Sequence, residues 1–413
     1  MLSARQLGLL TGLLVTLSAC NDSASVGPSP TVAAQVTTGG SDGAPRSTPA
    51  QSPAPPASQS STARKVAPPF RHPLPGMPPV LHNDVYAATG ADSVAARVAH
   101  DPAYLYVPDS QGSTTTVIDQ RSHTVVRVIR SGELSQHVSP SYDLRTLYVD
   151  ASAANQLVAI NPRTAKVQRR IPVPRPYNVY FTPDGRQAIV MVEEHNDIKF
   201  VDPHTFKGRD TLHVRSCDGP NHADFSGNGR FFLVTCEFSG TVLKVSTLTH
   251  QVLGRLELGA RSMPQDVRIS PDATTFFVAE MNRDQVAMID ARRFRQVGAI
   301  KTPSMPHGLM PSRDGRFLYV TDRGAGKISV VSFARRRVVD TWVIPGGGSP
   351  DMGAVSANGR VLWVSGRYDG VVYGFNTTNG RLVARIDVRG SPHGLAVWPQ
   401  PGRYSLGHTG NTR

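Results

Sequence analysis

The fold of this chain is decided by residues 306–322, which read PHGLMPSRDGRFLYVTD. Two apolar runs stand on either side of the pair Asp314-Gly315. An Asp-Gly pair between such runs predicts a tight hairpin, because glycine adopts a positive φ without a Cβ clash. The stretch therefore predicts two short antiparallel strands joined by a turn, and its pattern returns along most of the chain.

This hairpin recurs at intervals of 42 or 44 residues. Aligned on the opening proline, the copies begin at Pro176, Pro220, Pro264, Pro306, Pro350 and Pro392, and an earlier copy without the proline begins near Ser135. A period of about 40–50 residues is typical of one blade of a β-propeller. In the copy at 264 Ala273 stands where other copies have glycine, so we expect that turn to be strained or of another type.

Each hairpin is followed by two further apolar runs. The pattern of a third strand is found in seven segments, 117–119, 158–160, 200–202, 242–246, 286–290, 328–332 and 371–376. Each leads through a polar turn to a fourth strand, and no long helical period intervenes. The sequence therefore predicts an all-β fold, a seven-bladed β-propeller of four-stranded antiparallel blades.

The two ends of the repeat region are incomplete in a complementary way. Residues 104–129 supply a second, third and fourth strand, and residues 392–398 supply the missing first strand. We expect the ring to be closed by N- and C-terminal strands sharing a blade, which removes free edges. Residues 402–407 also resemble a second strand, so the tail either caps this blade or begins an eighth, incomplete unit; we favour seven blades.

The second strands carry a recurring tetrapeptide. Residues 319–322 read YVTD, and residues 148–150 and 106–108 are degraded copies. Over roughly residues 103–407 the chain resembles the YVTN-repeat propeller family, and it is similar to the exported envelope members of that family. The resemblance implies the fold and says little of function, because propellers host many unrelated activities. More distantly the chain is similar to the propeller of nitrous-oxide reductase, but it has too few histidines at matching positions to imply that enzyme's copper cluster.

The first twenty residues have the pattern of an export signal. An apolar run from Leu7 to Leu17 is too short to span a bilayer as a mature helix. It ends in Leu17-Ser18-Ala19-Cys20, which resembles the bacterial lipobox and implies a diacylglycerol on Cys20; the alternative is an ordinary secretory signal with an incidental cysteine. We expect a lipoprotein signal peptide at 1–20, a disordered Ser/Pro/Ala/Thr-rich linker at 21–76 and the propeller at 77–413, exported and lipid-anchored to the outer face of a bacterial membrane.

The net charge of +13 comes almost entirely from arginine. Such a charge raises the question of nucleic acid, but the basic residues are scattered and the expected anchor places the chain outside the cytoplasm. We therefore expect no nucleic-acid partner. The expected partners are the membrane, through the lipid anchor, and an unknown protein or small anionic ligand, and we expect a monomer.

Candidate functional residues gather at one end of the predicted channel. First strands begin at the same face where second strands end, so residues from both positions meet at one mouth. The ligand-binding candidates are His137, Asn178, His222, Asp266, His307, Asp351, His393, Glu193, Glu237, Glu280, Arg323 and Arg367, with His408 in the uncertain tail. They suit an anionic or sugar-like ligand or a metal, whereas the alternative is a wet channel whose polar groups bind water.

Two further expectations concern metals and thiols. The first-strand histidines lie on alternate or nearly alternate blades, so we expect them to be spread around the ring, assign no metal ligand and expect no cofactor, leaving a metal at the mouth as a possibility. Folding the hairpin about Asn228 brings Cys217 near Cys236, which predicts a disulfide in an oxidising compartment; free thiols or a Cys/His metal site with His222 are the alternatives.

The sequence favours a binding or interaction module that acts through the polar channel mouth. One alternative is an enzyme, a hydrolase, lyase or lactonase, in which a His/Glu pair acts as acid and base while Arg323 or Arg367 holds a carboxylate. No nucleophile–base pair is visible by spacing, so no catalytic residue is assigned. A structural envelope protein is the third possibility.

Overall fold

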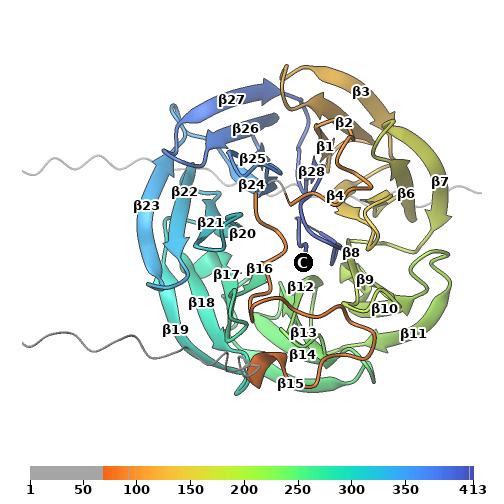
Figure 1. Ribbon diagram of the computed structural model, residues 1–413, viewed down its shortest axis with the longest axis vertical. Helices are drawn as coiled ribbons and strands as arrows, with labels where there is room; N and C mark the ends of the chain where they lie inside the picture. The colour runs from red at the N-terminus through yellow and green to blue at the C-terminus, as the bar shows by residue number, and fades with distance from the viewer. Residues whose placement is uncertain (1–67, 92, 409) are drawn as a thin grey trace, which may run out of the picture. The chain divides into compact units, whose positions relative to one another are not determined.

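A ring of seven four-stranded antiparallel sheets surrounds a central channel in the computed structural model, which describes residues 68–91, 93–408 and 410–413 (Figure 1). The predicted seven-bladed propeller is confirmed. The predicted signal peptide, Cys20 and most of the linker lie outside the described residues.

The innermost strands line the channel. They are β28 (Ala396–Trp398), β4 (Ser135–Pro140), β8 (Asn178–Phe181), β12 (Pro220–Phe225), β16 (Pro264–Ile269), β20 (Pro306–Pro311) and β24 (Pro350–Val355). The second strands are β1 (Tyr104–Pro108), β5 (Leu147–Ala151), β9 (Ala188–Val192), β13 (Phe231–Cys236), β17 (Thr275–Glu280), β21 (Phe317–Asp322) and β25 (Val361–Gly366).

The remaining strands complete each blade toward the rim. The third strands are β2 (Thr114–Asp119), β6 (Gln156–Asn161), β10 (Asp197–Val201), β14 (Thr241–Ser246), β18 (Gln285–Asp290), β22 (Lys327–Ser332) and β26 (Val371–Asn376). The fourth strands are β3 (Val125–Arg130), β7 (Lys166–Pro172), β11 (Gly208–His213), β15 (Val252–Glu257), β19 (Arg295–Lys301), β23 (Arg337–Val343) and β27 (Leu382–Asp387).

Helical structure in the described part of the chain is limited to single 3₁₀ turns. These are η1 (Pro68–Phe70), η2 (Glu193–His195) and η3 (Met281–Arg283). None of the helices in the described ranges is long and apolar enough to span a bilayer.

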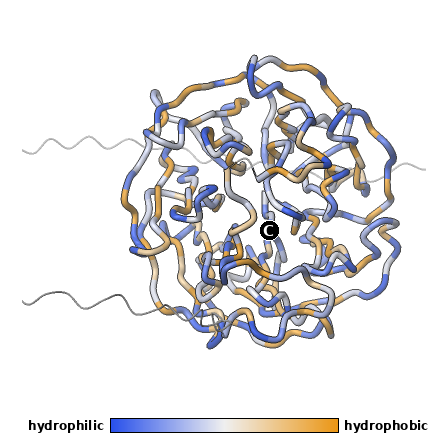
Figure 2. Tube along the Cα trace, in the orientation of Figure 1, coloured by the Kyte–Doolittle hydropathy of each residue, from blue (hydrophilic) through white to orange (hydrophobic). Residues whose placement is uncertain are grey.

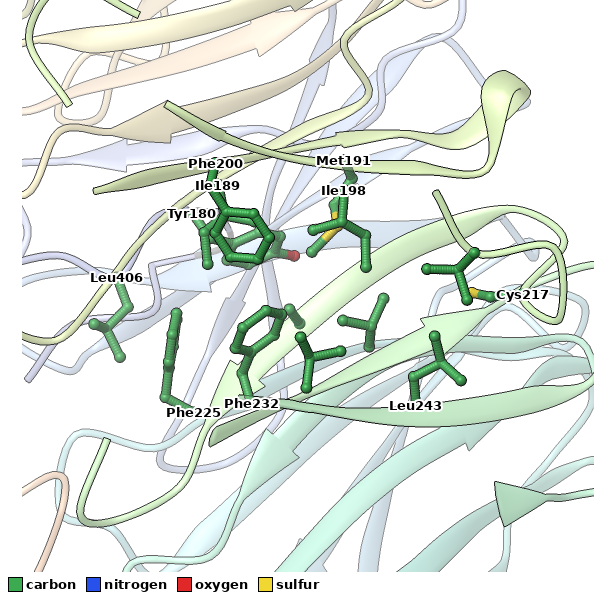
Figure 3. Packing of buried hydrophobic residues seen from close by; sticks show 14 of the residues in the cluster. Tyr180, Ile189, Met191, Ile198, Phe200, Cys217, Phe225, Phe232, Leu243 and Leu406 are labelled. Atoms are coloured by element: carbon green, nitrogen blue, oxygen red, sulfur yellow. The ribbon is translucent and has the colours of Figure 1, made fainter. Parts of the chain in front are cut away.

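Hydrophobic layers between neighbouring blades form the core. In one layer Phe200 of β10 and Tyr180 of β8 face Phe225 and Phe232 of the next blade (Figure 3). The middle strands are buried on both faces, whereas the outermost strands, such as β3 and β7, are mostly exposed. Hydrophobic and hydrophilic segments are both present in the trace around the ring (Figure 2). Burial between blades therefore stabilises the ring.

The closing blade joins the two ends of the repeat region. Its strand order is β28-β1-β2-β3, and the register pairs Tyr104 with Trp398 and Tyr106 with Ala396. The prediction that N- and C-terminal strands share a blade is therefore confirmed. A first strand from one end and three strands from the other leave no blade incomplete.

The tail after β28 differs from both expected arrangements. Residues 402–408 and 410–413 neither cap the closing blade nor begin an eighth one; they turn into the central channel, where the C label of Figure 1 lies. Ser405 forms a bridge with Thr412, and Gly407 with Tyr180 of β8. Leu406 is 1% exposed and joins the layer of Figure 3, so the tail is packed as part of the core.

The segment before the first blade also packs on the ring. Phe70 and Leu74 are buried, and the Leu74 amide donates to the Asn228 carbonyl in the β12–β13 turn. Contact with the propeller thus begins before residue 77, earlier than the expected boundary. Ala273, in the corresponding β16–β17 turn, has a φ of 54°, the left-handed conformation expected of glycine, and its methyl group packs in the same cluster as Phe70. That packing explains an alanine at a strained position.

Candidate functional site

A shared irregularity aims the channel side chains inward. At the start of β4, β12, β16, β20 and β24 the pairing with the second strand shifts register, between Pro306 and Leu309 in β20 for example. The skipped positions hold His137, His222, Asp266, His307 and Asp351. A bulge bends the strand and redirects its side chains. Threonines of the second strands take up the freed amides: Gly308 N donates to Thr321 Oγ1 at 2.7 Å, and His222 N to Thr235 Oγ1 at 3.1 Å.

Five histidines meet within the channel. The ring centroid of His137 lies 4.2 Å from that of His408, 4.5 Å from that of His393 and 5.5 Å from that of His222. His307 stands 5.8 Å from His393. All five side chains are nearly inaccessible to solvent. The expectation that the histidines are spread around the ring is wrong, because the channel is narrow enough for side chains from non-adjacent blades, such as His137 and His222, to approach one another.

Hydrogen bonds fix the orientation of two of these rings. His137 Nδ1 lies 2.9 Å from the carbonyl oxygen of Tyr177, and His222 Nδ1 contacts Asn221 Oδ1. Both oxygens accept, since the Asn221 amide nitrogen itself donates to Glu237 Oε2 at 2.7 Å. Each Nδ1 therefore carries the proton, and each Nε2 presents a lone pair.

Asp351 is the electrostatic centre of the other half of the cluster. Its Oδ1 lies 2.7 Å from His307 Nδ1 and 2.6 Å from Arg323 Nη2, and its Oδ2 accepts from His393 Nδ1 at 2.6 Å. Arg367 Nη1 stands 3.5 Å from the same Oδ2. Two guanidinium groups thus share one carboxylate, which leaves a net positive charge at this side of the mouth.

Burial sets the protonation states. Burial lowers the pKa of His137 to about 3, and it is also the largest cause that lowers the pKa of His222, His393 and His408, so these imidazoles are neutral at neutral pH. Burial alone would raise the pKa of Asp351, but Arg323, followed by His307 and His393, holds it well below its usual value.

A pair of carboxyl groups lies at the mouth on the blades of β9 and β13. Burial, and then the charge of Glu237, raises the pKa of Glu193 well above its usual value. Glu237 accepts from Asn221 Nδ2, and Asn221 in turn holds His222. Glu193 therefore keeps its proton to a higher pH than an exposed glutamate does, and the pair is linked to the histidines through a single amide.

Three predicted residues do not join the cluster. Asp266 is bound to the channel wall: its Oδ2 accepts from the Leu309 amide at 3.0 Å and its Oδ1 lies 3.2 Å from Arg268 Nη1. Glu280 accepts from Ser262 Oγ at 2.9 Å and from Gln285. Asn178 Nδ2 donates to the Asn221 carbonyl. These contacts hold neighbouring segments together and give the three side chains a structural part.

The tail contributes the histidine that sequence reasoning placed least well. The sequence pattern places His408 at the end of a second strand, yet in the structure it lies among the first-strand histidines. Gly407 offers a signal: its φ is 114°, and a Cβ there would lie 2.2 Å from the Val179 carbonyl oxygen. The tail can enter the channel at this point only because residue 407 has no side chain.

The two cysteines of the described part of the chain form a disulfide. Cys217, in the loop before β12, is bonded to Cys236 at the end of β13, as expected. Both are buried in the layer that also holds Leu406. A Cys/His metal site with His222 is therefore not formed.

Comparison with known proteins identifies the family of this chain and little else. A model of the YNCE-like beta-propeller family matches residues 74–401. Among the curated proteins no match is found.

Solved structures share the ring. A functionally unknown protein from Desulfotomaculum acetoxidans superposes with a TM-score of 0.63 and 16% identity, covering 71% of this chain and 98% of that one. Hydrazine synthase of Kuenenia stuttgartiensis superposes with a TM-score of 0.51 and 17% identity, covering 62% of this chain and 87% of that one. Dihydro-heme d1 dehydrogenase NirN superposes with a TM-score of 0.55 and 12% identity, covering 71% of this chain and 74% of that one. Identities this low support the fold alone.

Proposed function

We propose that this chain, which belongs to the YNCE-like beta-propeller family, binds a small anionic ligand at the mouth of its central channel. The observation that carries the proposal is the shared carboxylate of Asp351, on which Arg323 and Arg367 both converge. One carboxylate leaves one guanidinium charge uncompensated, and a carboxylate or phosphate on a ligand would complete the pairing.

The surroundings suit such a ligand. The Arg367 side chain remains 21% exposed, and the Arg323 guanidinium lies 5.9 Å from the ring of the exposed Tyr368. Arg323 Nη1 also contacts Met281 Sδ at 3.7 Å. Met281 lines a cavity of about 680 Å³ together with Arg261, Arg283 and Met305. Cations, an aromatic ring and a hollow of ligand size thus adjoin one another at the mouth.

Isothermal titration with galacturonate tests the proposal, with galactose as the neutral ligand of the same shape. We expect saturable binding of galacturonate that weakens with added salt, and a loss of roughly tenfold or more in Arg367→Gln, since a charge-assisted hydrogen bond contributes about 1.5–3 kcal/mol. Arg385→Gln is the matched control, because Arg385 packs on Tyr373 at the rim. Equal binding of galactose, or an unchanged affinity in Arg367→Gln, would refute the anion site.

The same proposal places the protein outside the cytoplasm as a lipid-anchored monomer with YVTN repeats. The Cys217–Cys236 disulfide supports an oxidising compartment. Metabolic labelling with a palmitate analogue should mark the chain and leave Cys20→Ser unlabelled. Label retained by Cys20→Ser would remove the anchor from the proposal.

A second candidate is an enzyme, favoured by the raised pKa of the Glu193 carboxyl, which is buried beside Glu237. A carboxylic acid kept neutral near pH 7 can serve as a general acid. Turnover of a γ-lactone or p-nitrophenyl ester that disappears in Glu193→Gln and persists in Glu194→Gln would support catalysis. No turnover above the solvent rate on these substrates counts against it.

A further inference from the structure

Three buried imidazoles from three separate segments converge beneath the mouth. His137 comes from β4, His222 from β12 and His408 from the tail, and one ring nitrogen of each lies within 4.8 Å of the other two. All three side chains are 0% exposed. Residues that are distant in the sequence are held together here by the closed ring and the inserted tail.

The converging nitrogens are without partners. Nε2 of His137, Nε2 of His222 and both ring nitrogens of His408 are buried with no hydrogen-bond partner among the described residues. Burying a polar atom without a partner costs free energy, and such a group calls for an explanation. A single ligand that binds all three imidazoles would explain why their nitrogens are buried without hydrogen-bond partners.

The second nitrogens are arranged as in metal-binding histidines. A histidine that coordinates a metal usually donates its other N–H to a carbonyl or carboxylate, which fixes the tautomer. His137 donates Nδ1–H to the Tyr177 carbonyl, and His222 donates Nδ1–H to the Asn221 side chain. Each therefore keeps an unprotonated Nε2 without a hydrogen-bond partner, and the His408 ring, whose nitrogens also lack a partner, lies 4.2 Å from the His137 ring and 5.1 Å from the His222 ring between centroids.

We propose that His137, His222 and His408 bind one first-row transition-metal ion, Zn²⁺ or Cu²⁺. Neutral imidazoles suit these ions, whereas Mg²⁺ and Ca²⁺ prefer oxygen ligands. Zn–N bonds of about 2.0–2.1 Å place tetrahedral ligand atoms roughly 3.4 Å apart, so binding draws the three rings together by about an ångström. Three protein ligands leave a fourth position for water or an exogenous ligand.

The metal also ties the tail to the ring. Because His408 lies on the tail and the other two ligands lie on β4 and β12, which belong to different blades, the bound ion crosslinks three segments. A ligand that binds only the folded state stabilises that state by mass action. The tail thereby closes the site that it helps to form.

Metal content of the full chain tests this inference. The protein is expressed in medium supplemented with zinc or copper sulfate, so that the ion is present while the tail enters the channel, and bound metal is measured by mass spectrometry after desalting. We expect about one equivalent in the native chain and at least a tenfold loss in His137→Gln and in His408→Gln. His213→Gln is the control, because that side chain is 54% exposed and pairs with Asp197 at the rim.

X-ray absorption on the native chain removes the dependence on variants that fold poorly. Scattering from three imidazole nitrogens at about 2.0 Å is expected. Metal content below about a tenth of an equivalent in the native chain, equal metal in His408→Gln, or an absorption spectrum without imidazole scattering would each overturn the site. These outcomes are independent of whether the mouth binds an anion.

Discussion

Arg413 Nη2 lies 2.7 Å from Asp224 Oδ1, so residue 413 is held by the wall of the channel that it fills. Asp224 Oδ1 also accepts from Asn411 Nδ2 at 3.0 Å, and its Oδ2 accepts from the Ile269 amide at 2.9 Å. The carboxylate is fully buried, and each of its oxygens has a donor. One side chain of β12 therefore fastens both the tail and the neighbouring blade.

Replacing Asp224 by asparagine should loosen the tail. The new amide nitrogen would face either the Arg413 guanidinium or the Ile269 amide, and both of these groups are hydrogen-bond donors, so no hydrogen bond could form there. The buried arginine would also lose its counter-charge. We expect the free energy of unfolding to fall by about 1–3 kcal/mol. Hydrogen exchange should increase in residues 402–413 before it increases in β12. Unchanged exchange in the tail would mean that Asp224 does not hold it.

The repeat pattern predicted the architecture well because each copy carries its own local signals. Asp314-Gly315 and its equivalents specify hairpins, and the spacing of the copies specifies blades. Even the positions of His307 and Asp351 at one mouth followed from the alignment. These features depend on neighbours in sequence, or on one repeated period, and neither requires knowledge of distances across the ring.

The contacts across the channel could not be obtained in this way. Whether His137 touches His393 depends on the width of the channel, and that width is set by the packing of all seven blades. The entry of His408 depends on the fit of Gly407 against Val179, a contact between segments more than two hundred residues apart. Asp351 could be placed at the mouth from its position, but its four partners come from one strand, β20, and three separate loops.

Asp322 predicts an unusual dependence of stability on pH. Burial raises the pKa of this carboxyl, at the end of β21, to about 8. A hydrogen bond donated by Ser329 Oγ at 2.7 Å lowers the pKa and offsets only part of this effect. The unfolded chain ionises near pH 4. Between pH 4 and pH 8 the folded state therefore holds a proton that the unfolded state releases, so this group lowers stability as the pH rises.

The variant Asp322→Asn should remove that penalty. Asparagine keeps an acceptor for Ser329 and carries no charge. We therefore expect the free energy of unfolding to rise by about 1–3 kcal/mol at pH 8 and by almost nothing at pH 4. Urea unfolding at the two pH values measures this change. Asp387→Asn, an exposed position on β27, is the control and should change little at either pH. A gain that is equal at both pH values would contradict the raised pKa.

The disulfide should contribute to the stability of the layer that encloses the tail. Cys217 and Cys236 close a loop with a sequence separation of 19 and are both buried. Loss of a crosslink of this length costs about 2–4 kcal/mol, chiefly by freeing the unfolded chain. The double variant Cys217→Ala/Cys236→Ala should unfold at lower urea, and reductant should affect the native chain only. A reductant effect on the double variant would indicate another cause.

Gly407→Ala should displace the tail without altering any polar group. A Cβ at this position would lie 2.2 Å from the Val179 carbonyl oxygen and 2.8 Å from Tyr180 Cα, and the φ of 114° is itself unfavourable for alanine. The backbone of β8 cannot yield without breaking its pairing with β9, so the tail must move, and His408 moves with it. We expect a loss of stability of about 2–4 kcal/mol and faster proteolysis after residue 402.

The matched change is Gly346→Ala, where the φ is also positive at 79° but no heavy atom lies within 4 Å of the added methyl group. The smaller loss of stability expected for Gly346→Ala measures the backbone strain alone. An equal loss of stability at the two positions would contradict the argument that contact with β8 makes the substitution at residue 407 unfavourable.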